Sequence, residues 1–135
     1  MTLTDAGALV ALIDKNQPQN LRCRATFATL SLPLVTTWPA FTEAMYLVHQ
    51  IGGWQLQRNL WEYVEEGVLH LRSSDETEQK RMRQLMEQYQ DTPMDLADAS
   101  LVVAAEVLNL TRIFTLDSDF YVYRINNTGM FEVVP

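Results

Sequence analysis

Short apolar stretches alternate with longer amphipathic ones along the whole chain. The short stretches are β-branched or alternating and predict strands, whereas the longer ones repeat apolar residues at helical spacing. We expect strands over residues 1–5, 34–37, 68–72, 111–117 and 130–135, and helices over 6–15, 19–30, 39–51, 54–67, 73–90 and 95–109. Because strands and helices alternate throughout, the sequence predicts an α/β sandwich with a mostly parallel sheet.

The ends of several helices carry recognisable signals. Pro39 suits the first turn of a helix, and Gly52 with Gly53 is expected to end that helix. The serines at 73–74 are expected to cap the acidic start of the helix over 73–90. These signals divide the long middle of the chain into separate helices.

Four carboxylates stand where predicted elements begin or end. Asp5 and Asp117 follow strands, and Glu43 and Asp98 lie in the first turns of helices. Functional groups gather at the carboxyl ends of parallel strands, so we expect these four side chains to converge. Four converging carboxylates repel one another unless a hard divalent cation such as Mg²⁺ binds them. The pattern therefore indicates a metal-dependent enzyme.

Each of these acids also has a simpler structural explanation. Asp5 suits the N-cap of the helix that follows it. Asp95 and Asp98 fit a capping box, which explains Asp95 fully and Asp98 less well, because the surroundings of Asp98 are small and apolar. Asp117 and Asp119 fit a turn after a strand. All four junction acids in one short chain nevertheless favour a shared site.

Glu43 lies beside an apolar helical stripe, where we expect it to be half buried; the alternative is an ordinary surface glutamate. His49 and His70 have no metal-ligand partner at helical spacing, so structural roles are expected for both. The glycines form no phosphate-binding loop, and no local signature of Ser/His/Asp catalysis is present. The carboxylates therefore carry the chemical signal.

Composition narrows the class of protein. The net charge of −7 argues against a protein that coats nucleic acid through a basic face. It does not exclude a nuclease, because bound metal would neutralise several acids. The single cysteine, Cys23, excludes an internal disulfide and fits a reducing cytoplasm. No apolar run reaches the length of a transmembrane helix, and the start of the chain lacks the pattern of a signal peptide.

Four segments together resemble the PIN domain, especially the VapC-like toxins of bacterial toxin–antitoxin pairs. The segments are TDAGALVALID, TEAMYLV, DLADASLVVAAEVL and RIFTLDSDFYVYR, and the resemblance spans residues 1–135 as a single domain. It implies a three-layer α/β/α sandwich around a parallel sheet. It also implies an endoribonuclease that depends on Mg²⁺ or Mn²⁺, a cytoplasmic homodimer, and a small antitoxin whose basic residue covers the acidic pocket.

The resemblance also assigns roles to individual residues. It matches the family's four acids to Asp5, Glu43, Asp98 and Asp117, its accessory acid to Asp119, and its small hydroxyl residue to Thr115. Asp95 matches no universal position. Four arginines are candidates for contacts to RNA phosphates: Arg22, Arg24, Arg81 and Arg83.

Two other classes remain open at this stage. A phosphoryl-accepting receiver domain also gathers acids at strand ends, but it needs a lysine after a late strand, and no lysine follows RIFTLD. A noncatalytic PIN-like scaffold would act only through protein binding. Against it, the chain keeps all four acids.

Overall fold

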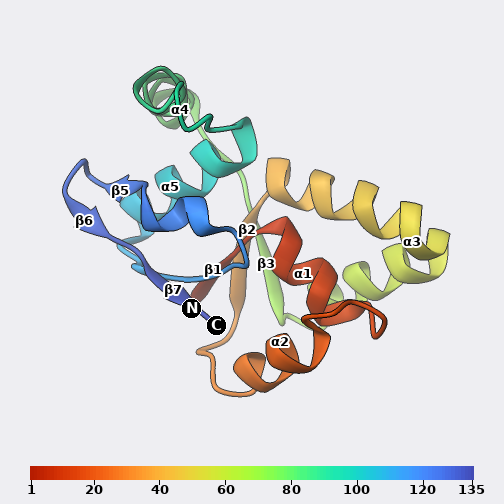
Figure 1. The fold of residues 1–135 in the computed structure, drawn as a ribbon. Helices are drawn as coiled ribbons and strands as arrows, with labels where there is room; N and C mark the ends of the chain where they lie inside the picture. The colour runs from red at the N-terminus through yellow and green to blue at the C-terminus, as the bar shows by residue number, and fades with distance from the viewer.

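The computed structural model describes residues 1–135, and its centre is a sheet of five strands (Figure 1). The spatial order is β3-β2-β1-β4-β7, and every neighbouring pair is parallel. The strands are β1 (Thr2–Thr4), β2 (Leu34–Thr37), β3 (Leu69–Arg72), β4 (Arg112–Phe114) and β7 (Glu132–Val134). The predicted α/β sandwich is therefore confirmed, with a central sheet that is wholly parallel.

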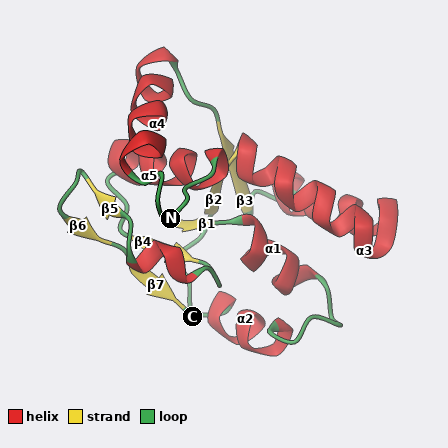
Figure 2. Ribbon diagram, turned by 45° about the horizontal axis from the view of Figure 1, so that its top comes forward, coloured by secondary structure: helices red, strands yellow, loops and turns green.

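Helices cover both faces of this sheet (Figure 2). They are α1 (Ala6–Ile13), α2 (Asn20–Phe27), α3 (Trp38–Glu65), α4 (Glu76–Gln88) and α5 (Leu96–Leu108), with a 3₁₀ turn, η1 (Ser118–Tyr121), after β4. No helix combines the length and apolar content that crossing a membrane requires.

Two apolar cores lie on opposite faces of the sheet. Helices α4 and α5 pack with Leu3, Val35 and Ile113, whereas α1, α2 and most of α3 pack with Leu34 and Phe114. Successive residues of a strand point to opposite faces, so adjacent residues such as Leu34 and Val35 enter different cores. The two cores hold α1, α3 and α5 against the sheet, and these three helices begin at the same end of it.

The predicted break at Gly52-Gly53 is confirmed. α3 consists of two helical halves that meet there at a kink, because both glycines have non-helical dihedrals, with Gly53 at φ 63°. Another predicted boundary was wrong. The helix expected over 73–90 starts later, because its cap is Asp75, which accepts a hydrogen bond from the Glu78 N–H, rather than a serine.

The C-terminal part differs most from the prediction. β4 ends at Phe114 instead of reaching Asp117, because Thr115 and Asp117 enter a hydrogen-bonded turn. The strand expected over 130–135 is shorter and is preceded by a small antiparallel hairpin, β5 (Arg124–Ile125) and β6 (Gly129–Met130). Asn126 and Asn127 turn this hairpin with positive φ values.

Candidate functional site

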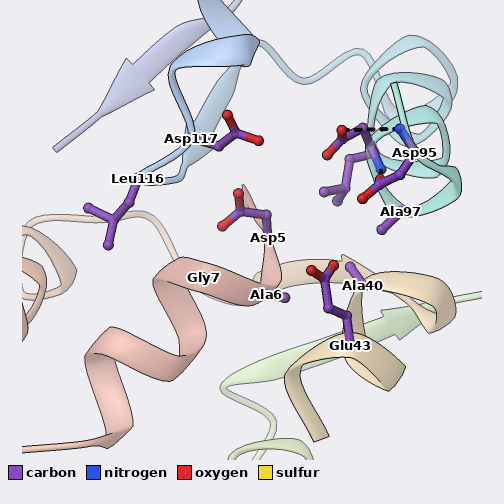
Figure 3. A pocket seen from close by; sticks show the side chains of 11 residues that line it. Asp5, Ala6, Gly7, Ala40, Glu43, Asp95, Ala97, Leu116 and Asp117 are labelled. Atoms are coloured by element: carbon purple, nitrogen blue, oxygen red, sulfur yellow. Dashed lines mark hydrogen bonds between the residues drawn. The ribbon is translucent and has the colours of Figure 1, made fainter. Parts of the chain in front are cut away.

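An acidic pocket opens at the carboxyl ends of β1 and β4, where the starts of α1, α3 and α5 meet (Figure 3). Its volume is about 280 Å³. The acids in its wall are Asp5, Glu43, Asp95, Asp98 and Asp117, and its other lining residues are Ala6, Gly7, Ala40, Ala97, Leu101 and Leu116. No lysine, arginine or histidine lines the pocket, so its negative charge has no protein cation beside it.

Asp5 is both a helix cap and a wall of the pocket. One carboxylate oxygen accepts a hydrogen bond from the Ala8 N–H (3.1 Å), and the other accepts one from the Thr115 hydroxyl. Only 9% of Asp5 is exposed, and this burial raises its pKa to about 6. The two hydrogen bonds oppose the rise, whereas the charges of Asp117 and Glu43 add to it. Hydrogen bonds to both of its oxygens therefore fix the Asp5 carboxyl group in place. Its pKa of about 6 lies closer to neutral pH than that of an ordinary aspartate.

Asp98 is fixed by its neighbours on two sides. It forms the predicted capping box with Asp95: the Asp95 carboxylate accepts from the Asp98 N–H (2.8 Å), and Asp98 Oδ2 accepts from the Asp95 N–H (3.4 Å). The hydroxyl of buried Tyr123 donates to the same Oδ2 (3.0 Å). Burial, and then the charge of Asp95, raise the pKa of Asp98 well above its usual range. Capping and membership of the pocket are therefore compatible.

Asp117 enters the pocket from the turn after β4. Its N–H donates to Thr115 Oγ (3.0 Å). Its carboxylate accepts from the Asp119 N–H (2.9 Å), and through this bond Asp117 caps η1. Because the Thr115 hydroxyl also donates to Asp5, this buried residue connects the two acids of the neighbouring strands. Asp119 lies in η1 and does not line the pocket.

Glu43 reaches the pocket from α3, but the prediction that it is half buried was wrong. Ala40 and Ala44 turn into the cores, whereas Glu43 is exposed at the open side of the acidic pocket. The pocket walls still desolvate its carboxylate in part, which raises its pKa, and the charges of Asp95 and Asp117 raise it further. Glu43 therefore belongs to the same electrostatic group as the buried acids.

The other candidate residues lie outside the acidic pocket. His49 and His70 are exposed on α3 and β3, and Cys23 is buried in a core. The guanidinium of Arg81 binds both oxygens of Glu106 (2.9 and 3.0 Å). Arg83 pairs with Glu87 within its own helix (3.7 Å). Of the four candidate arginines, two therefore already have a carboxylate partner.

Three solved structures share this fold. VapC20 of Mycobacterium tuberculosis, described as a toxin that cleaves the sarcin–ricin loop, matches with a TM-score of 0.85 over 100% of both chains at 12% identity. A toxin–antitoxin complex from Klebsiella pneumoniae matches with a TM-score of 0.69 and 14% identity, over 89% of this chain and 90% of the other. FitAcB from Neisseria gonorrhoeae matches with a TM-score of 0.69 and 18% identity, over 98% and 97%.

The chain has the PIN-domain fold. The three-layer sandwich that the sequence resemblance implied is therefore confirmed. No protein-family model and no curated protein sequence matches this chain. At 12–18% identity, the likeness to solved structures extends to the fold and not to the chemistry.

The residues that line the acidic pocket of this PIN-fold chain fit a hard divalent cation. The pocket offers only carboxylate oxygens as charged groups, and the raised pKa values of Asp5 and Asp98 reflect burial and mutual repulsion without a balancing charge. No three His, Cys, Asp or Glu side chains stand close enough together to form a ready-made ligand cluster. The pocket therefore has the donor chemistry of a metal site, but its side chains are not drawn together.

We expect the metal-free protein to become more stable as the pH falls, because protonation removes the buried negative charge of Asp5. The pKa of Asp5 is about 6 in the fold against an ordinary 3.8, so the folded chain binds more protons between these values. The free energy of unfolding should therefore rise as pH falls through 6 and level off below 3.8. A shift of this size corresponds to about 3 kcal/mol.

Asp5→Asn isolates this effect, because asparagine caps helices as well as aspartate does and does not titrate. In EDTA, denaturant unfolding should show the variant to be more stable than the wild type at pH 7, and the difference should vanish near pH 4. A difference that is independent of pH would contradict the raised pKa of Asp5.

Proposed function

We propose that this chain is a metal-dependent endoribonuclease that cleaves RNA phosphodiester bonds, and that it is the toxin of a type II toxin–antitoxin pair. The observation that carries the proposal is the pocket of five carboxylates at the carboxyl end of a PIN-fold sheet. VapC20, which shares the fold over its whole length, is described as a toxin that cleaves the sarcin–ricin loop. Residues 1–135 would act as a single domain.

Asp5, Glu43, Asp98 and Asp117 would hold one or two Mg²⁺ or Mn²⁺ ions and serve as the catalytic acids. Asp119 is proposed as an accessory ligand, although its side chain stands outside the pocket wall. A bound divalent cation would supply positive charge that activates water and stabilises the negative charge of the transition state of phosphodiester cleavage.

Other side chains of the protein would position the catalytic acids. Thr115 orients the carboxylate of Asp5, and Tyr123 orients that of Asp98. The small side chains of Ala40 and Ala97 leave room in the pocket wall for a phosphate. These contacts fix the orientation of Asp5 and Asp98 before substrate arrives.

The proposed partners are RNA, a small antitoxin encoded next door and a second copy of this chain, in the cytoplasm. The structure from Klebsiella is itself a toxin–antitoxin complex. Exposed apolar side chains on α3, among them Tyr46, Ile51 and Trp54, support an interface with another protein chain. A basic side chain of the antitoxin would neutralise the acidic pocket, which has no cation of its own.

The two other classes have less support. A receiver domain needs a lysine at its acidic site, and no lysine lines this pocket. A noncatalytic scaffold would not need Thr115 and Tyr123 to hold the carboxylates in place. An activity assay separates the scaffold from the enzyme.

The test is cleavage of single-stranded RNA by the purified chain in Mg²⁺, followed by gel electrophoresis, with Asp117→Asn purified in parallel. We expect defined RNA fragments from the wild type and none from the variant. The variant keeps the cap of η1, because an asparagine oxygen can also accept from the Asp119 N–H. Equal cleavage by both proteins would identify a contaminating nuclease, and no cleavage by either would support the scaffold.

A further inference from the structure

A second hollow adjoins the acidic pocket on the side of η1. Its volume is about 180 Å³, and it shares Leu116 and Asp117 with the acidic pocket. Its remaining walls are Arg22, Thr115, Ser118, Tyr121, Val133 and Pro135. Figure 3 shows the Leu116 and Asp117 side chains diverging from one loop, with that of Asp117 on the side of Asp5. The two hollows therefore lie side by side, with Leu116 and Asp117 between them.

Arg22 is the only lysine or arginine that lines either hollow. It is exposed on α2, and no carboxylate lies within ion-pair distance of its guanidinium, whereas Arg58, Arg72 and Arg81 each have such a partner. A free guanidinium is the group best suited to bind a phosphate through two parallel hydrogen bonds. In a chain of net charge −7, Arg22 is therefore a positive charge beside five carboxylates that a polyanion must approach.

Tyr121 gives the same hollow an aromatic surface. Its side chain is 57% exposed on η1, although aromatic side chains are commonly buried. An exposed aromatic ring beside a phosphate-binding cation is the usual combination in sites for unpaired nucleotides, because every base can stack on such a ring. A base within a duplex has both faces covered and cannot stack there.

We infer that Arg22 and Tyr121 form a subsite for the nucleotide next to the scissile phosphate in single-stranded RNA. Arg22 binds the neighbouring phosphate, and Tyr121 stacks on its base. The inference rests on the proposed ribonuclease function and adds a substrate class to it: RNA that is unpaired at this position. Both side chains are positioning residues, because neither lines the acidic pocket itself.

The test compares Arg22→Gln with Arg24→Gln. Arg24 is a matched control: it lies two residues away on α2, is also exposed and has no carboxylate partner, but it lines a different hollow with Lys15 and Tyr63. With a short, fluorescein-labelled single-stranded RNA in Mg²⁺, Arg22→Gln should raise KM about tenfold with kcat unchanged. It should also lower the slope of log affinity against log salt by about 0.7. Arg24→Gln should change neither.

Tyr121→Ala should raise KM for the single-stranded RNA about tenfold and leave KM for the same sequence in a duplex unchanged. Arg22→Lys keeps the charge, so it should keep the salt slope while weakening binding. Thermal melts of all variants check that each is folded. Equal effects of Arg22→Gln and Arg24→Gln on KM and on the salt slope would overturn the subsite.

Equilibrium binding of the same RNA in EDTA, measured by fluorescence anisotropy, separates this inference from the proposed function. If the wild type cleaves RNA but binds it no better than Arg22→Gln does, the subsite fails and the ribonuclease stands. If the wild type binds RNA through Arg22 and Tyr121 but never cleaves it, the ribonuclease fails, and with it the placing of this subsite beside a scissile phosphate; only a binding site for single-stranded RNA remains. If the wild type neither binds nor cleaves RNA, both fail.

Discussion

Asp98→Asn is expected to lower the rate of RNA cleavage about a thousandfold while leaving the folded chain at least as stable as the wild type. Metal-assisted charge stabilisation is worth several kcal/mol, and each 1.36 kcal/mol is tenfold in rate. The hydrogen bonds from the Asp95 N–H and the Tyr123 hydroxyl both end on the same oxygen, Oδ2 of Asp98. The single oxygen of asparagine can accept both, so the variant loses the charge and keeps the capping box.

The matched control is Asp91→Asn, which removes one negative charge from an exposed position outside the pocket. Its cleavage rate and melting temperature should equal those of the wild type. Melts in EDTA and cleavage assays on the same preparations decide the matter. If Asp98→Asn is destabilised but fully active, Asp98 serves α5 as a capping residue and takes no part in catalysis.

Removal of divalent metal is expected to abolish cleavage completely, and Mg²⁺ or Mn²⁺ should restore it. Metal should also stabilise the fold, because binding to the native state alone adds about 2.7 kcal/mol at a hundred times the dissociation constant. Bound metal also offsets the burial of the Asp5 carboxylate, which is the main cause of its raised pKa, and the smaller repulsion from Asp117 and Glu43. Thermal melts with and without Mg²⁺, beside the cleavage assay, measure both effects.

The variant Asp98→Asn supplies the control for metal binding. It has one carboxylate fewer in the pocket, so Mg²⁺ should shift its melting temperature much less than that of the wild type. An equal shift in both proteins would place the metal elsewhere on the chain. Undiminished cleavage in EDTA would mean that the chemistry needs no divalent cation.

The position of the site could be predicted from sequence because it follows from topology. Asp5 and Asp117 come after strands that are expected to be parallel, and parallel strands bring their carboxyl ends to one edge. For Asp95 the capping box is a sufficient explanation from sequence alone, so the same reasoning predicts no second role for it. In the structure its carboxylate caps α5 and also lines the pocket. The catalytic and metal-binding roles of Asp5, Glu43, Asp98 and Asp117 stay predictions.

Other parts of the site have no local signal in the sequence. Tyr123 holds Asp98 across 25 residues of chain, and nothing in the surrounding YVYR pattern indicates such a contact. η1 is too short for a helical periodicity to emerge, so Tyr121 could not be placed beside Arg22. The apolar stripe of α3 predicts a half-buried Glu43, but the side chain faces the open acidic pocket and is exposed there.

The order of the strands has a consequence for synthesis of the chain on the ribosome. β4 pairs with β1 in the sheet although the two strands lie far apart in sequence, so Asp5 is made long before the strand that brings Asp117 to it. A nascent chain that ends before Arg112 lacks Asp117, Thr115 and Tyr123, and with them one wall of the acidic pocket. A chain of that length therefore carries Asp5, Glu43, Asp95 and Asp98 without the complete acidic pocket.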